Sequence, residues 1–232
     1  TNDVTVAGAN TIRIKTGGTL RMANDPREPR GWDRWFWKSG ARDVSLRSNL
    51  NFSQLFTMAT EPDVPCQLVF KPELAESWKW VDDRTLEVKL RQGVKFHNKP
   101  PVNGREMTDD DVVWAATQFT KNDTIRSMVQ YAPNVEKIEA VDKYTVRFRL
   151  SVPMPSFLTE GLTIEYGALI VPREVVDAKG RWDDPDKSYI GTGPFTFKQH
   201  VPGVRTSFVK HKEYFKKGLP YLDALDYMVV PD

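Results

Sequence analysis

The chain has 232 residues, of which 40% are hydrophobic and 28% are charged, and these values are typical of a globular protein with a sizeable core. Its 33 Lys and Arg residues nearly balance its 31 Asp and Glu residues, so a basic surface for nucleic acid is not expected. The single cysteine, Cys66, excludes an internal disulfide framework and a zinc site made of several cysteines. No apolar run approaches the roughly 20 residues that a membrane-spanning helix needs.

Residues 1–18 end in two glycines and are predicted to form a flexible leader. They are polar and lack the apolar core of a signal peptide, so we interpret the chain as a mature or trimmed piece of a protein. Residues 19–23 are predicted to form a short strand, because Leu20 and Met22 alternate with polar neighbours. Residues 46–57 are predicted to be a helix. Its buried side would consist of Leu50, Leu55, Phe56 and Met58.

Two segments in the middle of the chain have the pattern of half-buried strands. Residues 78–81 and 85–91 flank an acidic two-residue turn, and apolar and charged side chains alternate along the second of them. Residues 144–150 repeat this pattern after another acidic turn. We therefore expect residues 85–91 and 144–150 in one antiparallel sheet. Trp78, which begins a strand in this region, is predicted to be buried.

Residues 107–120 have the clearest helical pattern. Thr108 is the expected N-cap, and residues 109–111 are aspartates that the helix dipole would stabilise in the first turn. The triple aspartate also suggests a metal site, but consecutive helical side chains point in different directions, so we favour the capping role. The apolar stripe of this helix would consist of Val112, Val113, Ala116 and Phe119.

The last third of the chain has the pattern of several short elements. We expect a buried strand over residues 168–171, a helix over 173–179, a hairpin of strands 195–201 and 206–210, and a final strand over 223–230.

The sequence patterns of common catalytic and metal sites are missing. His97, His200 and His211 belong to no zinc-hydrolase motif, and no serine stands in a nucleophile-elbow pattern. Residues 191–193 begin like a phosphate-binding loop but lead into a strand, whereas that loop needs a helix N-terminus. We therefore expect no catalytic residue, no metal ligand and no cofactor, which favours a binding protein over an enzyme.

Three segments carry a resemblance to a known family. They are residues 72–115 (PELAESWKWVDDRTLEVKLRQGVKFHNKPPVNGREMTDDDVVWA), residues 145–155, and residues 189–222 (YIGTGPFTFKQHVPGVRTSFVKHKEYFKKGLPYL). Together they resemble the family 5 extracellular solute-binding proteins of bacterial ABC transporters, the dipeptide- and oligopeptide-binding group. The resemblance covers about residues 19–232. His211 and Phe215 depart from it, since the family often has Asn and Trp at these positions.

The resemblance implies an α/β fold of the periplasmic-binding-protein type II class, in the cluster of peptide binders. The fold would be incomplete, with one lobe's mixed sheet and a smaller α+β subdomain. Residues 19–44 and 166–232 would belong to lobe I, and residues 45–165 would form the subdomain packed on it. Family members are considerably longer, so the chain is expected to be an N-terminal fragment from which the second lobe is absent.

The implied function is that of a substrate-binding receptor of an ABC importer. It would capture a peptide or similar small solute in a cleft between two lobes and deliver it to permease subunits. The implied location is the periplasm or the cell surface, with membrane association only through the permease or a lipid anchor outside this chain, and no nucleic-acid partner is expected. The alternative is a hydrolase of peptides or glycosides with unidentified carboxylates, which would consume its ligand.

The resemblance also suggests ligand-binding residues. It places the loop after the first strand in the cleft, and the segment after the long helix would reach the ligand. An ordinary loop residue is the alternative for each position, and a packed aromatic ring is the alternative for the tyrosine. Residues 191–194 are expected to shape the sheet near the hinge. The predicted ligand-binding residues are Asn24, Asp25, Arg27, Trp32 and Tyr131. The ligand's identity as a peptide, a sugar, a metal chelate or another solute is left open.

Overall fold

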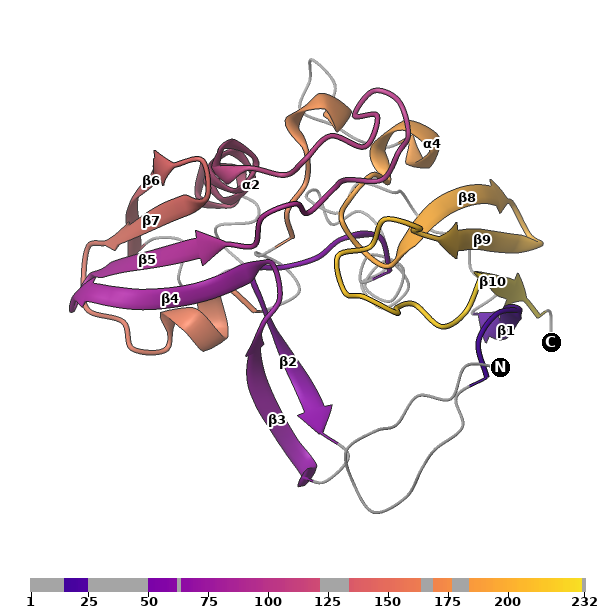
Figure 1. The fold of residues 1–232 in the computed structure, drawn as a ribbon, viewed down its shortest axis with the longest axis horizontal. Coiled ribbons are helices and arrows are strands. Elements are labelled where there is room, and N and C mark those ends of the chain that lie inside the picture. The colour runs from indigo at the N-terminus through magenta and orange to yellow at the C-terminus, as the bar shows by residue number, and fades with distance from the viewer. Residues whose placement is uncertain are drawn as a thin grey trace.

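The computed structural model describes residues 15–24, 50–61, 64–121, 134–163, 169–176 and 184–230. Within these ranges, residues 24, 58–61, 64–69, 119, 121, 160 and 188 are described by their backbone alone. Most of the predicted leader, residues 1–14, lies outside this description. The strands of the described chain form two four-stranded sheets and one two-stranded hairpin (Figure 1).

The first sheet has the strand order β1-β10-β9-β8. β1 runs parallel to β10, whereas β9 is antiparallel to both of its neighbours. The predicted first strand, the predicted hairpin and the predicted final strand are confirmed. The bounds are Thr19–Asn24 for β1, Phe195–Val201 for β8, Arg205–Lys210 for β9 and Ala224–Val229 for β10.

A row of aromatic rings fills the buried face of this sheet. Phe197 of β8, Phe208 of β9 and Tyr227 of β10 are all at most 5% exposed. Neighbouring rings in the row meet edge to face with centroids 5.9 Å apart. Such pairs contribute about 0.5–1.5 kcal/mol each beyond the burial of their area. The row therefore joins the β8–β9 hairpin to β10.

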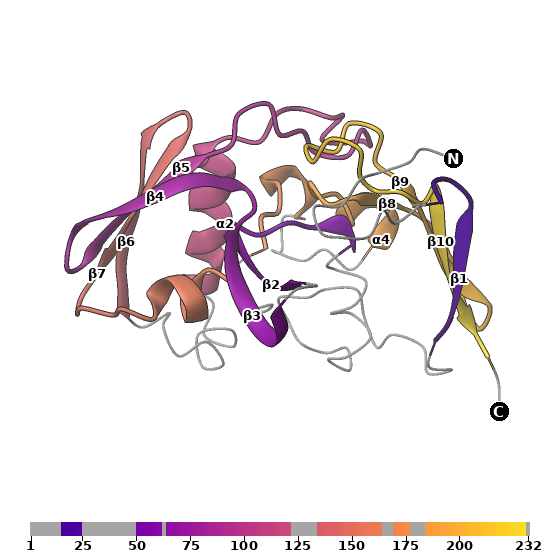
Figure 2. The same ribbon diagram turned by 60° about the horizontal axis from the view of Figure 1, so that its bottom comes forward.

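The second sheet has the order β4-β5-β7-β6 and is antiparallel throughout. The helix α2 lies against β6 and β7, on the face that is turned toward the rest of the molecule (Figure 2). The prediction that residues 85–91 and 144–150 share one sheet with this helix packed on it is confirmed. The bounds are Ala75–Asp82 for β4, Thr85–Leu90 for β5, Asp109–Lys121 for α2, Val135–Asp142 for β6 and Thr145–Leu150 for β7.

The two faces of the second sheet differ as the alternation predicts. On the inner face, Leu86 and Val88 of β5 are fully buried, and so are Val146 of β7 and Val112 of α2. Burying each such side chain contributes about 1.5–3 kcal/mol. On the outer face, Glu87 pairs with cations from both neighbouring strands. Its partners are Lys79 at 2.9 Å and Arg147 at 2.6 Å.

The predicted helix over residues 46–57 is wrong at its C-terminal end. Residues 50 and 51 are helical, but Phe56 begins strand β2 (Phe56–Glu61), which pairs with β3 (Val64–Pro72) in a hairpin that projects from the two larger sheets (Figure 1). The carbonyl of Leu55 accepts hydrogen bonds from the amides of Glu73 and Ala75. The Phe56 ring stacks on Phe70 with centroids 4.9 Å apart. These distant partners, rather than the helical spacing of the apolar residues, decide the backbone here.

The prediction that Trp78 is buried is also wrong, since the residue is 37% exposed. Its register partner is Val88, so it lies on the inner face of the sheet as expected. However, β4 is an edge strand, and β5 covers it on one side only. The indole meets Phe56 and Phe70 edge to face at 5.2 and 5.3 Å, and its remaining surface contacts solvent.

The elements expected over residues 168–179 are shorter than predicted. Leu169 makes a single β-bridge with Gln54 instead of a strand, although it is buried together with its two successors. Arg173–Val175 form a 3-10 turn, η3, and residues 177–183 lie outside the described chain. The other short helical elements are the π-helical turn η2 (Phe157–Gly161) and α4 (Pro185–Ser188).

Candidate functional site

The carboxyl end of the parallel pair β1–β10 is the candidate site. The two strands run in register from Thr19 beside Ala224 to Asn24 beside Val229, so they end at the same edge of the sheet. In open α/β sheets, ligands bind outside the carboxyl ends of parallel strands. The chain leaves this edge at Asn24 and enters the segment that contains most of the predicted ligand-binding residues.

The structure places the predicted site residues only in part. The backbone of Asn24 ends β1 at the candidate edge. Asp25, Arg27, Trp32 and Tyr131 lie outside the described residues, so their roles stay predictions.

Asp223 holds β1 in its position on β10. Its carboxylate accepts a hydrogen bond from the Gly18 amide at 2.9 Å, and its own amide donates to the Gly18 carbonyl at 3.0 Å. Gly17 and Gly18 have φ values of +85° and +81°, which glycine adopts without strain. The two glycines thus turn the chain into β1 at a defined register, and this register sets where Asn24 emerges.

Three exposed valines that the sequence analysis missed lie near the same edge. The tip of the β8–β9 hairpin lies next to the end of β10, where the Val229 amide donates to the Val204 carbonyl at 2.9 Å. Val201, Val204 and Val230 are 37%, 47% and 52% exposed. Scattered exposed valines are ordinary, but these three belong to adjoining segments beside the candidate site. The signal in the sequence is the pair of valines that flanks the turn at residues 202–203.

The segment over residues 191–194 connects the two large sheets indirectly. It leads into β8 of the first sheet, and its Gly191 carbonyl accepts a hydrogen bond at 2.9 Å from the amide of His97, in the loop that follows β5 of the second sheet. A Cβ atom on Gly191 would lie 2.2 Å from the Asn51 carbonyl oxygen, and one on Gly193 would lie 2.5 Å from the Asn51 carbonyl carbon. The Gly193 amide donates to that carbonyl oxygen at 2.9 Å, and the Asn51 side-chain amide donates to the Phe195 carbonyl at 3.0 Å. Glycine is therefore needed for close backbone contact at these positions.

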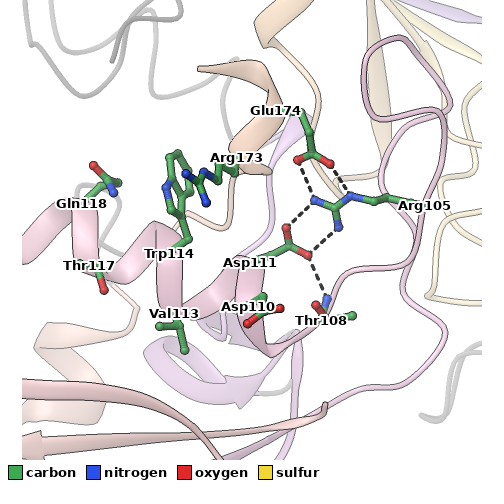
Figure 3. Close-up of a pocket in the computed structure, with 10 residues that line it drawn as sticks. All are labelled: Arg105, Thr108, Asp110, Asp111, Val113, Trp114, Thr117, Gln118, Arg173 and Glu174. Carbon is green, nitrogen blue, oxygen red and sulfur yellow. Dashed lines mark hydrogen bonds and ion pairs between the residues drawn. The ribbon is translucent and has the colours of Figure 1, made fainter. Parts of the chain in front are cut away.

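A concavity of about 900 Å³ lies at the start of α2, next to η3 (Figure 3). The Arg105 guanidinium donates to both carboxylate oxygens of Asp111 and to both of Glu174, over distances of 2.6–2.8 Å. These hydrogen bonds raise the pKa of Arg105, and Arg105 in turn lowers the pKa of the Glu174 carboxyl. The network ties α2 to η3, and every carboxylate oxygen in it accepts a hydrogen bond from Arg105, so its geometry is that of a structural contact.

Of the three aspartates at the start of α2, Asp111 has the predicted capping role. The Asp111 carboxylate accepts a hydrogen bond from the Thr108 amide at 3.0 Å, which is the capping-box contact that satisfies an amide at a helix start. Burial, followed by the charge of Asp110, raises the pKa of Asp109. Within the described ranges, no three His, Cys, Asp or Glu side chains are grouped so that they could hold a metal ion.

None of the helices in the described part of the chain is long and apolar enough to cross a membrane.

Comparison with known proteins connects this geometry to a family. The model of the bacterial extracellular solute-binding proteins, family 5 (middle region), matches residues 69–232. Di/tripeptide-binding protein 2 of Pseudomonas aeruginosa is 33% identical, in an alignment that covers 66% of this chain and 31% of that protein. The oligopeptide-binding protein AppA of Bacillus subtilis is 30% identical, in an alignment that covers 78% of this chain and 32% of that protein.

A solved structure of the Bacillus subtilis AppA, in complex with a nonapeptide, has the same fold. Its TM-score is 0.73 at 27% identity, and the match covers 94% of this chain and 41% of that one. The chain thus spans about a third of the length of the curated relatives it matches. The fold is that of the periplasmic binding proteins, with mixed α/β sheets. The matched region includes the whole second sheet and, of the first sheet, β8, β9 and β10, and the chain belongs to the bacterial extracellular solute-binding proteins of family 5.

Proposed function

We propose that this chain forms part of a substrate-binding receptor of an ABC importer, and that it is not an enzyme. The receptor would bind a peptide or similar small solute and release it unchanged to permease subunits. The observation that carries this proposal is the family match over residues 69–232, which includes more than half of the chain. The relatives named above are a di/tripeptide-binding and an oligopeptide-binding protein, which supports a peptide as the first ligand to test.

The proposed site is one wall of a cleft between two lobes. Residues 19–44 and 166–232 would form lobe I, residues 45–165 would form the subdomain packed on it, and the second lobe would lie outside this chain. Two four-stranded sheets joined at residues 191–194 are compatible with this division. The wall would consist of the carboxyl edge of β1 and β10 and of the segment that follows Asn24.

Each proposed ligand-binding residue has a role that its chemistry allows. Asn24 can donate to and accept from a peptide backbone, and Arg27 and Asp25 can pair with a terminal carboxylate and a terminal amine. Trp32 and Tyr131 would supply aromatic surface for apolar side chains. The exposed valines beside Asn24 extend such an apolar wall.

The proposed location is the periplasm or the outer cell surface. The relatives belong to a family of extracellular solute-binding proteins, which supports export. Association with the membrane would occur through the permease or through a lipid anchor outside this chain. The docking partner would be the permease subunits of the importer.

Incubation of the chain with a defined mixture of di-, tri- and nonapeptides tests the proposal. After removal of free peptide, mass spectrometry should find intact peptide that the protein retained and no cleavage products. Arg27→Ala should weaken retention about tenfold or more, since a charged hydrogen bond contributes about 1.5–3 kcal/mol. Lys79→Ala, on the outer face of the second sheet, is the matched control and should bind as the unmodified chain does. Cleaved peptides would instead support the hydrolase.

A further inference from the structure

Two buried imidazole rings meet at a single carbonyl oxygen in the segment that joins the sheets. His97 lies between β5 and α2, and His211 directly follows β9; they are 0% and 5% exposed. The Nε2 atom of His97 lies 3.0 Å from the Gly193 carbonyl oxygen, and the Nδ1 atom of His211 lies 3.1 Å from the same oxygen. The rings are nearly perpendicular, with centroids 4.7 Å apart.

The hydrogen bonds define where the protons are. The Gly191 amide donates to the Nδ1 atom of His97 at 3.3 Å, so this nitrogen carries no proton, and Nε2 must donate to the Gly193 carbonyl. His211 donates to that carbonyl through Nδ1, and its Nε2 atom is buried without a hydrogen-bond partner in the described chain. Both rings are therefore neutral in this fold.

A proton added to either ring disrupts the contacts of the pair. On His97 it would place two N–H donors, those of Nδ1 and of the Gly191 amide, against each other, and the hydrogen bond to the Tyr189 backbone that favours the charged ring is a smaller effect than burial. On His211 it would create a buried donor without an acceptor, and a buried unpaired charge is unfavourable. Burial is the largest cause that lowers the pKa of both rings, and the pKa of His97 falls to about 3. One added charge also opposes a second, because the rings are in contact.

The charged groups around the pair act in opposite directions. Lys99 lowers the pKa of His97, whereas Glu213 raises the pKa of His211. Glu213 is itself held by Lys95 in an exposed pair at 2.5 Å. On the other side, His211 faces the ring of Tyr214, whose pKa is raised by burial and by Glu73. The first proton is therefore expected on His211, the only ring of the two with a nearby carboxylate that favours it.

We propose that His97 and His211 form a proton-sensitive latch on residues 191–193. In the neutral state the latch fixes these residues to the His97 segment, because the His97 amide also donates to the Gly191 carbonyl at 2.9 Å. Residues 191–193 in turn hold the backbone of Asn51 through the Gly193 amide. Uptake of one proton by the pair loosens this junction and allows the two large sheets to move relative to each other. The device needs no ligand and so stands apart from the proposed function.

Amide hydrogen exchange of the 232-residue chain between pH 7.5 and 4.5 tests the latch. After correction for the intrinsic pH dependence of exchange, protection of a peptide that spans residues 191–195 should fall at least tenfold toward pH 4.5. His211→Asn keeps a side chain that can donate to the Gly193 carbonyl but cannot titrate, and it should lose most of this pH dependence. His200→Asn changes a histidine of β8 that bonds Thr206 instead, and it should behave as the unmodified chain.

Long-range ¹H–¹⁵N spectra of the imidazole rings give a second readout that needs no variant. At pH 6.5 they should show His97 protonated at Nε2 alone and His211 at Nδ1 alone. The proposal is overturned if either ring is cationic there, or if the protection of residues 191–195 is independent of pH. It is equally overturned if His211→Asn shows the full pH dependence of the unmodified chain.

Discussion

Replacement of Gly191 by alanine should destabilise the fold by about 2–6 kcal/mol. The new Cβ atom would lie 2.2 Å from the Asn51 carbonyl oxygen and 2.5 Å from the Phe52 ring, whereas ordinary contact begins at 3.4 Å. Overpacking of this kind costs about 1–3 kcal/mol. If the backbones separate to relieve it, the hydrogen bond from Gly193 to Asn51 is lost, and an unsatisfied buried group costs about 1–3 kcal/mol more.

Urea unfolding followed by circular dichroism measures this loss. Gly203→Ala is the matched control, because Gly203 has nothing within 4 Å of its added Cβ but has a φ of +67°. The left-handed conformation alone should cost alanine about 1–2 kcal/mol there. A loss for Gly191→Ala that is no larger than that for Gly203→Ala would refute the claim that close backbone contact between residues 191–193 and Asn51 stabilises the fold.

Three further outcomes follow from the same structure. Arg105→Met should lower the free energy of unfolding in urea by about 2 kcal/mol, because it leaves the nearly buried Asp111 carboxylate without its cation. The control, Arg173→Met on the exposed rim of the concavity, should change it by less than about 0.5 kcal/mol. Trp78→Ala should cost about 2 kcal/mol, since the ring is 37% exposed; a loss above about 4 kcal/mol would contradict its edge position. The pKa of His97 is lowered from 6.5 to about 3, so below pH 6.5 the unfolded chain binds a proton at this residue that the folded chain does not. The free energy of unfolding should therefore be unaffected by His97 above pH 6.5 and should decrease by about 1.4 kcal/mol per pH unit below it. His97→Gln should flatten this decrease between pH 6.5 and 4.5, and an unchanged slope would contradict the neutral buried ring.

The sequence predicts those elements whose own side chains determine the outcome. Alternation over residues 85–91 and 144–150 correctly indicates two strands of one sheet, since each has one apolar and one charged face. The apolar stripe and the aspartates correctly indicate α2. The turn at residues 202–203 correctly indicates the β8–β9 hairpin.

Elements that depend on distant partners could not be predicted in this way. The spacing of Leu55 and Phe56 fits a helix, but the Leu55 carbonyl accepts hydrogen bonds from the amides of Glu73 and Ala75 instead of from a helical neighbour. Strand β6 was missed because its apolar residues do not alternate regularly with polar ones, and register shifts interrupt its pairing with β7. The face of the sheet on which Trp78 lies could be inferred from the sequence, but its position on an edge strand follows from the strand order alone.

The candidate site was predicted by resemblance and not by residue pattern. The chain gives no local signal that Asn24 ends a strand parallel to β10, because the two strands are about two hundred residues apart and meet only in the fold. The contact of His97 and His211 with the Gly193 carbonyl could not be predicted for the same reason, since it brings together three separate segments of the chain.

Isothermal titration of peptides into this chain tests the central claim that residues 1–232 supply one wall of a two-lobed binding site. The Bacillus subtilis AppA with a nonapeptide is the reference, because the chain matches 41% of that structure. Pocket sites bury about 70–90% of a small ligand, and a single wall loses a large part of those contacts. Every 1.4 kcal/mol of lost binding energy weakens affinity about tenfold, so the chain should bind any peptide it accepts at least about a hundredfold more weakly than AppA binds its nonapeptide. An affinity equal to that of AppA would place the whole site within this chain and would contradict the account.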